Sequence, residues 1–353
     1  MVTPFDNSRS ISFLAFGMNL AQDVPAALEA VNTPNGQVVK ATLSGFEKEL
    51  EDAADERKQK ATEYFKAGEQ DFAADNYTSA AKNYQASMQL LPTMAACLNA
   101  GAAFLYISDY PGAAQAYQQG LKIARQKGDQ QYEANFLGNI GIIYGQQGKL
   151  DNALIYLKQG LEIQKAIGDK LGQANQLGNI GNIYYLKDKL DDALNYHKQA
   201  LEIDRAIGKK LGQAQDLGNI ALVYQDKGKL DDALNYHKQA LELHKFIGYK
   251  LGQAEDLGNI GIIYKTQGKL DDALDYQEQA LEIDKAIGNK LGQAISLNNI
   301  GHIYDFKGRL DDALNYLTQA YSIFEQIGAA RELKIAEENI QKVKQQQAAG
   351  ARK

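Results

Sequence analysis

Apolar side chains recur along most of the chain at the spacing of an amphipathic helix. One segment places them three or four positions apart, at Leu171, Ala174, Leu177, Ile180 and Tyr184. This spacing gathers them on one face and predicts a helix over about residues 171–187. A second series follows, at Ala193, Tyr196, Ala200, Ile203 and Ile207. It predicts a second helix that begins at Leu190 and is closed by Gly208.

This two-helix pattern returns every forty residues. The sequence LGQA begins at residues 171, 211, 251 and 291, and LDDAL begins at residues 190, 230, 270 and 310. Repeats of this length are typical of stacked helix pairs that share a continuous core. Five clear units are predicted to begin near residues 134, 174, 214, 254 and 294. A sixth covers residues 94–128, a shorter seventh covers 61–93, and the polar residues 332–347 predict a capping helix.

Several positions within the unit have a predicted structural role. Where the first helix ends, most units carry glycine, which suits a left-handed residue, and one unit carries Asp188, which tolerates it less well. Gly181 and its equivalents are expected to let the two helices approach closely. Tyrosines equivalent to Tyr184 and Tyr196 are expected to fill the seams between units. Paired acidic residues at the start of the second helix indicate capping rather than acid–base catalysis.

The repeated motif resembles the tetratricopeptide repeat. In one unit its small and large positions are occupied by Ala174, Leu177, Gly181, Tyr184, Ala193, Ala200 and Leu201. The forty-residue length is similar to the long-repeat branch found in kinesin light chains and Pins-type polarity adaptors. The resemblance implies an all-α fold, a right-handed α-solenoid of about seven helix pairs with a C-terminal capping helix. We divide the chain into a non-repeat segment (1–56), the repeat array (57–328) and a capping helix with a polar tail (329–353).

Residues 1–56 do not follow the forty-residue period. The sequence TPNG at 33–36 predicts a turn, and DVPAALEAV at 23–31 is compatible with a short helix. From Thr42 onward, Phe46 and Leu50 have helical spacing. Three placements stay open for this segment. It caps the array, lies in the array's own groove, or docks on a second copy of the chain.

An asparagine recurs at one position of the first helix, at Asn99, Asn139, Asn179, Asn219, Asn259 and Asn299. Because asparagine is a weak helix former, helix stability does not explain its recurrence. The first helix of each pair is expected to line the concave surface, with the asparagine at the edge of that surface. A carboxamide can hold the N–H and C=O groups of an extended peptide. With helices about 10 Å apart and about 3.3 Å per residue, each asparagine would contact every third peptide residue.

The resemblance implies the same role, because kinesin light chain and O-GlcNAc transferase repeats carry asparagine ladders at this position. Further amides lie about one turn away and extend the expected binding surface: Asn135, Asn175, Asn182 and Gln215. The alternative is that each asparagine bonds the backbone of the next unit and fixes the stacking geometry. The sequence leaves both interpretations open.

Charge and composition narrow the classes of partner. The formal net charge of −6 arises within residues 1–56, so the array is neutral overall and is not expected to attract nucleic acid. No apolar run reaches the length of a membrane span, although residues 11–18 weakly resemble a signal peptide. Cys97 is the only cysteine, which rules out an internal disulfide and favours the cytoplasm.

We predict no catalytic, metal or cofactor site. His197 and His237 occupy the same position in adjacent second helices, and His244 lies seven residues after His237. We interpret these three as part of a solvated helix face, because no carboxylate or thiol stands at ligand spacing. Only His302 is predicted to face the groove. Cys97 stands at an apolar helix position and is predicted to be an inert core thiol.

These predictions favour a non-enzymatic adaptor, a protein–protein interaction scaffold whose concave groove binds an extended segment of a protein or peptide partner. One alternative is a self-assembling structural protein, in which the non-repeat segment or the array ends join copies into homo-oligomers. The other is a regulator that senses a signalling peptide.

Overall fold

The computed structural model describes residues 28–33, 36–43, 46–47, 50 and 55–350. The signal-peptide-like stretch at 11–18 lies outside these residues. The chain divides into two compact units, residues 1–208 and 209–353, each of which we describe by itself. Over the described part of the chain, no helix is both long enough and apolar enough to cross a bilayer.

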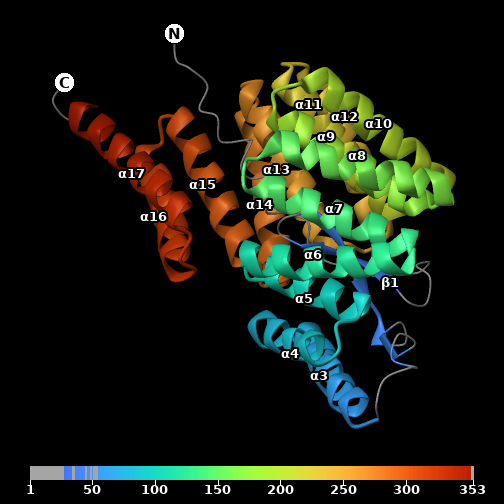
Figure 1. The fold of residues 1–353 in the computed structure, drawn as a ribbon. Coiled ribbons are helices and arrows are strands. Elements are labelled where there is room, and N and C mark those ends of the chain that lie inside the picture. Colours follow the sequence, from blue (N-terminus) through green and yellow to red (C-terminus); the bar gives the residue numbers. More distant parts are fainter. Residues whose placement is uncertain (1–27, 34–35, 44–45, 48–49, 51–54, 351–353) are drawn as a thin grey trace. The chain divides into compact units, whose positions relative to one another are not determined.

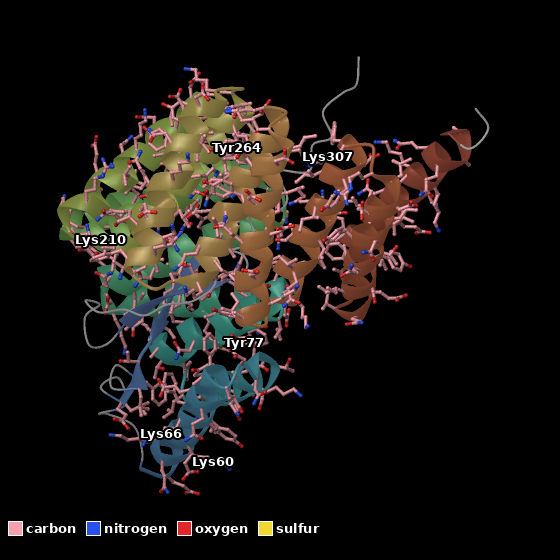
Figure 2. The ribbon with its side chains drawn as sticks, turned by 180° about the vertical axis from the view of Figure 1, so that it is seen from behind. Lys60, Lys66, Tyr77, Lys210, Tyr264 and Lys307 are labelled. Atoms are coloured by element: carbon pink, nitrogen blue, oxygen red, sulfur yellow. The ribbon has the colours of Figure 1, made fainter. Side chains whose placement is uncertain are left out.

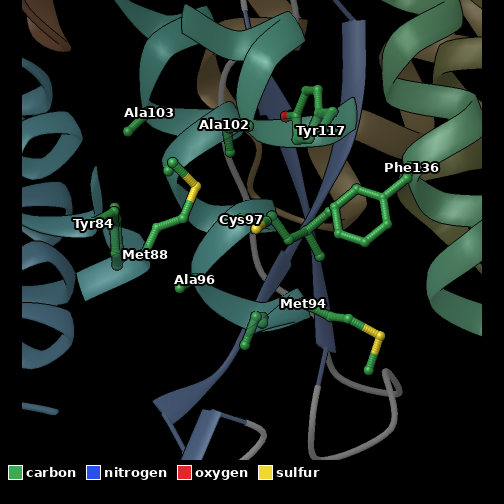
Figure 3. Packing of buried hydrophobic residues seen from close by; sticks show 14 of the residues in the cluster. Tyr84, Met88, Met94, Ala96, Cys97, Ala102, Ala103, Tyr117 and Phe136 are labelled. Carbon is green, nitrogen blue, oxygen red and sulfur yellow. The ribbon is translucent and has the colours of Figure 1, made fainter. Parts of the chain in front are cut away.

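Among its described residues, the first unit contains four helix pairs and one two-stranded sheet, and Figure 1 shows their arrangement. The pairs are α3 (Asp55–Ala73) with α4 (Tyr77–Leu90), α5 (Met94–Tyr106) with α6 (Tyr110–Lys127), α7 (Gln130–Gln146) with α8 (Leu150–Ile167), and α9 (Lys170–Leu186) with α10 (Leu190–Ala206). Each pair packs against the next, and Cys97 lies buried within the core that they share (Figure 3). The predicted core position of this thiol is therefore confirmed.

The second unit contains three helix pairs and a terminal helix. The pairs are α11 (Lys210–Asp226) with α12 (Leu230–Phe246), α13 (Lys250–Thr266) with α14 (Leu270–Ala286), and α15 (Lys290–Phe306) with α16 (Leu310–Gln326). Helix α17 (Ala330–Gly350) packs against α16. The prediction of seven helix pairs followed by a capping helix is confirmed within the described residues. We call the first helix of each pair the A helix and the second the B helix.

The turn between the A and B helices requires a left-handed residue, as predicted. Gly148 has φ 71°, and Asp188 has φ 59° at the equivalent position. Asp75 and Ser108, which the sequence had not singled out, take this conformation in the first two pairs with φ 59° and 58°. A short polar side chain tolerates this backbone, so the turn survives without glycine.

Glycine brings the A and B helices together where the sequence predicted close approach. A Cβ added to Gly141 would lie 2.7 Å from a Leu157 side-chain carbon and 3.2 Å from the Ala153 carbonyl oxygen. The tyrosines pack against the core between successive repeats, as predicted, and they also stack within one repeat. Tyr184 and Tyr196 stack with ring centroids 5.2 Å apart, and this pair joins the A and B helices of one repeat rather than filling only the seam between repeats.

The acidic residues at the start of the B helices do not cap them, so that prediction is wrong. Helix α8 has no side-chain cap, and its Asp151 instead binds the Lys187 ammonium at the end of the next A helix, at 2.5 Å. In the second unit Asp271 pairs with Lys307, which is labelled in Figure 2. The carboxylate prefers this charged partner because the B helix begins beside the end of the following A helix. These ion pairs are exposed and contribute little to stability.

The N-terminal segment forms a β-hairpin of β1 (Leu28–Thr33) and β2 (Gly36–Ala41). The antiparallel register pairs Thr33 with Gly36, the first and last residues of the predicted TPNG turn. Residues 34–35 of that turn lie outside the described residues. The short helix suggested for residues 23–31 is wrong at residues 28–31, which lie in β1, and residues 23–27 lie outside the described chain. Strand pairing prevailed because β2 offers β1 a hydrogen-bonding edge.

This segment adopts two of the three placements left open by the sequence. Strand β2 packs against α5, α7 and α9, all of which are A helices. The residues that follow close the start of the array, because Phe46 is buried and stacks on Phe65 with ring centroids 4.1 Å apart. Leu50 is buried as well. Docking on a second copy remains a prediction.

Candidate peptide-binding site

The six asparagines predicted to bind a peptide lie on the A helices. We call the surface that carries them the A-helix face. Successive A helices contact one another within each unit, as α7 contacts α9 and α13 contacts α15. Elements on the inner side of a curved stack approach most closely, so these contacts place the A helices on the inner side of the stack in each unit.

Asn99 shows how a carboxamide on this face holds an extended backbone. Its Oδ1 accepts the Ala41 N–H at 2.6 Å, and its Nδ2 donates to the Ala41 carbonyl oxygen at 2.8 Å. Both residues have no exposed surface. One side chain therefore satisfies both backbone groups of one residue of β2.

The two asparagines predicted on α7, a helix that β2 contacts, are also buried. Asn135 is 5% exposed and Asn139 is 3% exposed. The Nδ2 group of each has no hydrogen-bond acceptor within the described part of the chain. A buried donor without an acceptor is costly, so each amide is a point where a bound backbone carbonyl would stabilise the complex.

The remaining predicted residues are partly exposed. The side chains of Asn179, Asn219 and Asn259 form no hydrogen bond with any other described residue. Asn175, Asn182 and Gln215 are exposed to a similar degree. The Asn299 Nδ2 donates to the Gln277 Oε1 at 3.4 Å, a weak contact between neighbouring helices. The Asn299 contact is with a side chain of the preceding B helix and not with the backbone of the next repeat. The peptide-binding role of these residues stays a prediction.

A seventh asparagine of the series was missed. Asn339 lies on α17, forty residues after Asn299, and its Nδ2 donates to the Asn298 Oδ1 at 3.4 Å. The signal was present in the sequence, because Ile340 follows Asn339 as Ile300 follows Asn299. The polar composition of α17 concealed it, and the capping helix is thus a degenerate A helix.

Ionisable groups on the A-helix face of the second unit have shifted pKa values. Burial, reinforced by Asp256 and Asp284, raises the pKa of the Glu255 carboxyl well above its usual range. Burial lowers the pKa of Lys265. Burial, together with the charges of Lys265 and Lys342, lowers the pKa of His302 to about 4. His302 is therefore neutral at physiological pH.

The histidines on the B helices are buried, so the prediction of a solvated face is wrong. His237 and His244 donate from Nδ1 to the two carboxylate oxygens of Asp256, at 3.2 and 2.8 Å, and all three side chains are about 95% buried or more. His197 is 1% exposed, and burial lowers its pKa to about 3. The sequence held a signal here, because positions 197 and 237 align with Leu157 and Leu317 of the apolar core.

The described side chains of the A-helix face present hydrogen-bonding groups. No group of three metal-ligating side chains gathers within the described ranges. The buried imidazole–carboxylate cluster is sealed between α12 and α13, where a substrate cannot reach it. The A-helix face carries amides at regular intervals, and in the second unit it also carries ionisable groups such as Glu255 and His302.

A sequence profile of the tetratricopeptide repeat matches residues 132–206, 212–286 and 257–326, which together make up more than half of the chain. The chain belongs to the tetratricopeptide repeat family. Tetratricopeptide repeat proteins are protein-interaction scaffolds that are generally not catalytic, and this array is such a scaffold. No curated protein sequence matches the chain.

Several solved structures share this fold. BtubC from P. vanneervenii is 17% identical, with a TM-score of 0.56 over 62% of this chain and 92% of that one. A signal transduction ATPase from Pyrococcus horikoshii with a tetratricopeptide repeat sensor is 17% identical, with a TM-score of 0.63, and the match covers 87% of this chain and 49% of that protein. A Rap protein complexed with competence and sporulation factor is 15% identical, with a TM-score of 0.57 over 87% and 92%. At these identities the likeness shows the fold alone.

Proposed function

We propose that this protein is a non-enzymatic adaptor whose A-helix face binds an extended segment of a protein partner through its asparagine series. Residues 57–328 form the binding array, residues 1–56 the non-repeat segment, and residues 329–353 the cap. The partner is a protein or a peptide, and the compartment is the cytoplasm. No cofactor, catalytic residue or nucleic acid enters the proposal.

The observation that carries this proposal is the pair of hydrogen bonds between Asn99 and Ala41. The same recognition that we propose for a partner is made here on a strand of the chain itself. Asn179, Asn219 and Asn259 repeat this carboxamide in A helices, partly exposed and without a partner among the described residues. An incoming backbone therefore meets amides that have no competing bond to break.

The spacing of the amides indicates which backbone conformation can reach several of them. Packed helices lie about 8–10 Å apart. A β-strand presents backbone groups to one side at every second residue, about 6.7 Å apart, whereas polyproline II presents them at every third residue, about 9.3 Å apart. The proposed ligand therefore has a polyproline II-like backbone where it spans several repeats. The shorter period of a strand is consistent with β2 satisfying Asn99 but not Asn139.

A peptide selected from a random display library on the full-length chain provides a probe for this proposal. The triple variant Asn219→Ala, Asn259→Ala, Asn299→Ala should bind the selected peptide at least about tenfold more weakly, because each lost backbone hydrogen bond costs about 1 kcal/mol. The melting temperature should stay the same or rise slightly, because alanine is the better helix former.

The chain offers a matched control in the same three repeats. Gln239, Gln279 and Gln319 are exposed amides on the B helices, and their replacement by alanine should leave the dissociation constant unchanged. Equal affinities for the asparagine variant and this control would contradict the proposal. A lower melting temperature of the asparagine variant, with matching loss of binding, would favour the stacking role instead.

A further inference from the structure

We propose that the β1–β2 hairpin is a resident occupant of a strand-binding site over α5 and α7, and that an extended segment of a partner binds there by displacing it. This inference rests on the proposed function only in taking the A-helix face as the peptide-binding surface. It adds that part of the surface is already filled by the chain itself.

The asparagines are buried on the two helices that β2 contacts most, α5 and α7, whereas Asn179 on α9, which β2 contacts less, is partly exposed. Asn99 and Asn139, on helices that β2 contacts, are 0% and 3% exposed. The equivalent Asn219 and Asn259 of the second unit are partly exposed. Since the residue type and the helix position are the same, the difference comes from what covers them. In the first unit that cover includes the hairpin.

The hairpin fits this site incompletely. It satisfies both hydrogen-bonding groups of Asn99 but leaves the Nδ2 donors of Asn135 and Asn139 buried without an acceptor in the described chain. A segment that brings carbonyl oxygens to these two donors would remove that cost. The site is thus more complementary to some other backbone than to the one it holds, and this makes the hairpin displaceable.

The hairpin can leave without loss of the N-terminal cap. Phe46 and Leu50 are buried, and Phe46 stacks on Phe65 of α3. These contacts lie after the strand in sequence and do not involve Asn99. A displaced hairpin therefore stays tethered beside its site at a high effective concentration, and a partner must compete with it.

The site also limits the chemistry of the partner. Ala41 is completely buried where Asn99 holds it, so the partner residue at this point must be small. Its backbone must be extended, with free N–H and C=O groups facing Asn99 and carbonyl oxygens facing Asn135 and Asn139. The partner is therefore an extended protein segment with alanine, glycine or serine at the Asn99 position.

A synthetic peptide of residues 28–43, labelled with a fluorophore, tests whether the site can be vacated. In the full-length variant Ala41→Pro the hairpin loses the N–H that Asn99 accepts, while Asn99 itself is intact. Ala41→Gly is the matched control, because glycine keeps that N–H. Fluorescence anisotropy should show the peptide binding Ala41→Pro at least about tenfold more tightly than it binds the wild type or Ala41→Gly. Adding Asn99→Ala to Ala41→Pro should abolish this gain.

Equal affinity of the peptide for Ala41→Pro and the wild type would overturn the proposal. Hydrogen exchange in the full-length chain gives a second test that does not depend on the proline variant. The Ala41 amide should exchange at least about tenfold faster in Asn99→Ala than in the wild type, while the Phe46 amide, which donates to the Thr42 carbonyl, should not change. Equal exchange of the Ala41 amide in both proteins would also overturn it.

These results separate the two proposals. The peptide of residues 28–43 reports on Asn99 and the hairpin alone. The library peptide reports on Asn219, Asn259 and Asn299 of the second unit. Failure of the first experiment with success of the second removes the resident hairpin and leaves the adaptor. Failure of the second experiment contradicts peptide binding by the asparagine series, independently of the result for the hairpin.

Discussion

The asparagines on α5 and α7 of the first unit and those on α11 and α13 of the second unit are in different states. Over α5 and α7 these side chains are buried, and Asn99 is bonded to the backbone of β2. Over α11 and α13 Asn219 and Asn259 are partly exposed. The chemistry of the carboxamide is identical, so its state depends on what lies against it. The repetition of a residue identifies its position on the helix, but it does not show whether another segment of the chain covers that residue.

The layers between successive repeats differ in the same way. In the first unit one such layer contains Tyr117 and Phe136, which lie in an apolar core. In the second unit the equivalent positions are His237 and Asp256, joined through a hydrogen bond. Both layers are buried, but the polar one depends on every member finding its partner. The second unit is therefore more sensitive to the loss of a single polar group.

The largest effect is expected from a substitution that disrupts the polar layer of His237 and Asp256. Asp256→Ala leaves His237 and His244 buried without their shared acceptor and should destabilise the second unit by about 3 kcal/mol. Unfolding in urea, followed by circular dichroism, measures this loss. A triple variant supplies the control by copying the apolar layer of Leu317, Phe324 and Ala336. His237→Leu, His244→Phe, Asp256→Ala should be at least as stable as the single variant, and an equally large loss in both would contradict the role given to the carboxylate.

A prediction of intermediate size concerns how the stability of each unit depends on pH. Burial raises the pKa of the Asp284 carboxyl to about 6, although a hydrogen bond from Asn289 opposes this shift. The unfolded carboxyl has an ordinary pKa near 3.8, so the folded chain binds more protons than the unfolded chain between about pH 4 and 6. This contribution to stability is complete below about pH 4 and is lost as the pH rises to about 6, by about 2 kcal/mol.

The neutral variant Asp284→Asn isolates this contribution. Urea unfolding of both proteins at pH 4 and pH 7 should give a smaller pH dependence for the variant. In the first unit His197 has the opposite sign, because its pKa is lowered to about 3 and stability is lost as the pH falls below about 6.5. A wild type and an Asp284→Asn variant with the same pH profile would show that Asp284 keeps an ordinary pKa.

The smallest effects are expected from substituting one asparagine on the A-helix face of each unit and comparing the resulting changes in stability. Asn99→Asp keeps the acceptor for the Ala41 N–H but turns a carboxylate toward the Ala41 carbonyl, and should cost about 1–2 kcal/mol. Asn259→Asp is partly exposed and should change stability by less than about 0.5 kcal/mol. Native-state hydrogen exchange measures both changes. Similar values would mean that the hairpin does not distinguish the two faces.

Local patterns in the sequence were sufficient for the helices. The forty-residue period predicted seven pairs and a cap, and the turn residue Asp188 was predicted to be left-handed from its alignment with glycine. Close approach at Gly141 was predicted for the same reason. These features depend on residues that lie within one repeat of one another, so their spacing along the chain carries the information.

Contacts between segments that are distant in sequence could not be predicted from the spacing of residues along the chain. Asn99 bonds Ala41 across 58 positions, and nothing in the spacing of either residue indicates the other. The pairing of Asp151 with Lys187 and the burial of His237 likewise depend on how one repeat packs on the next. The sequence by itself determined the helices, their number and the positions of the asparagines, because helical periodicity is local. Only the tertiary structure decided which amides are covered and which histidines are buried, since packing between segments selects those partners.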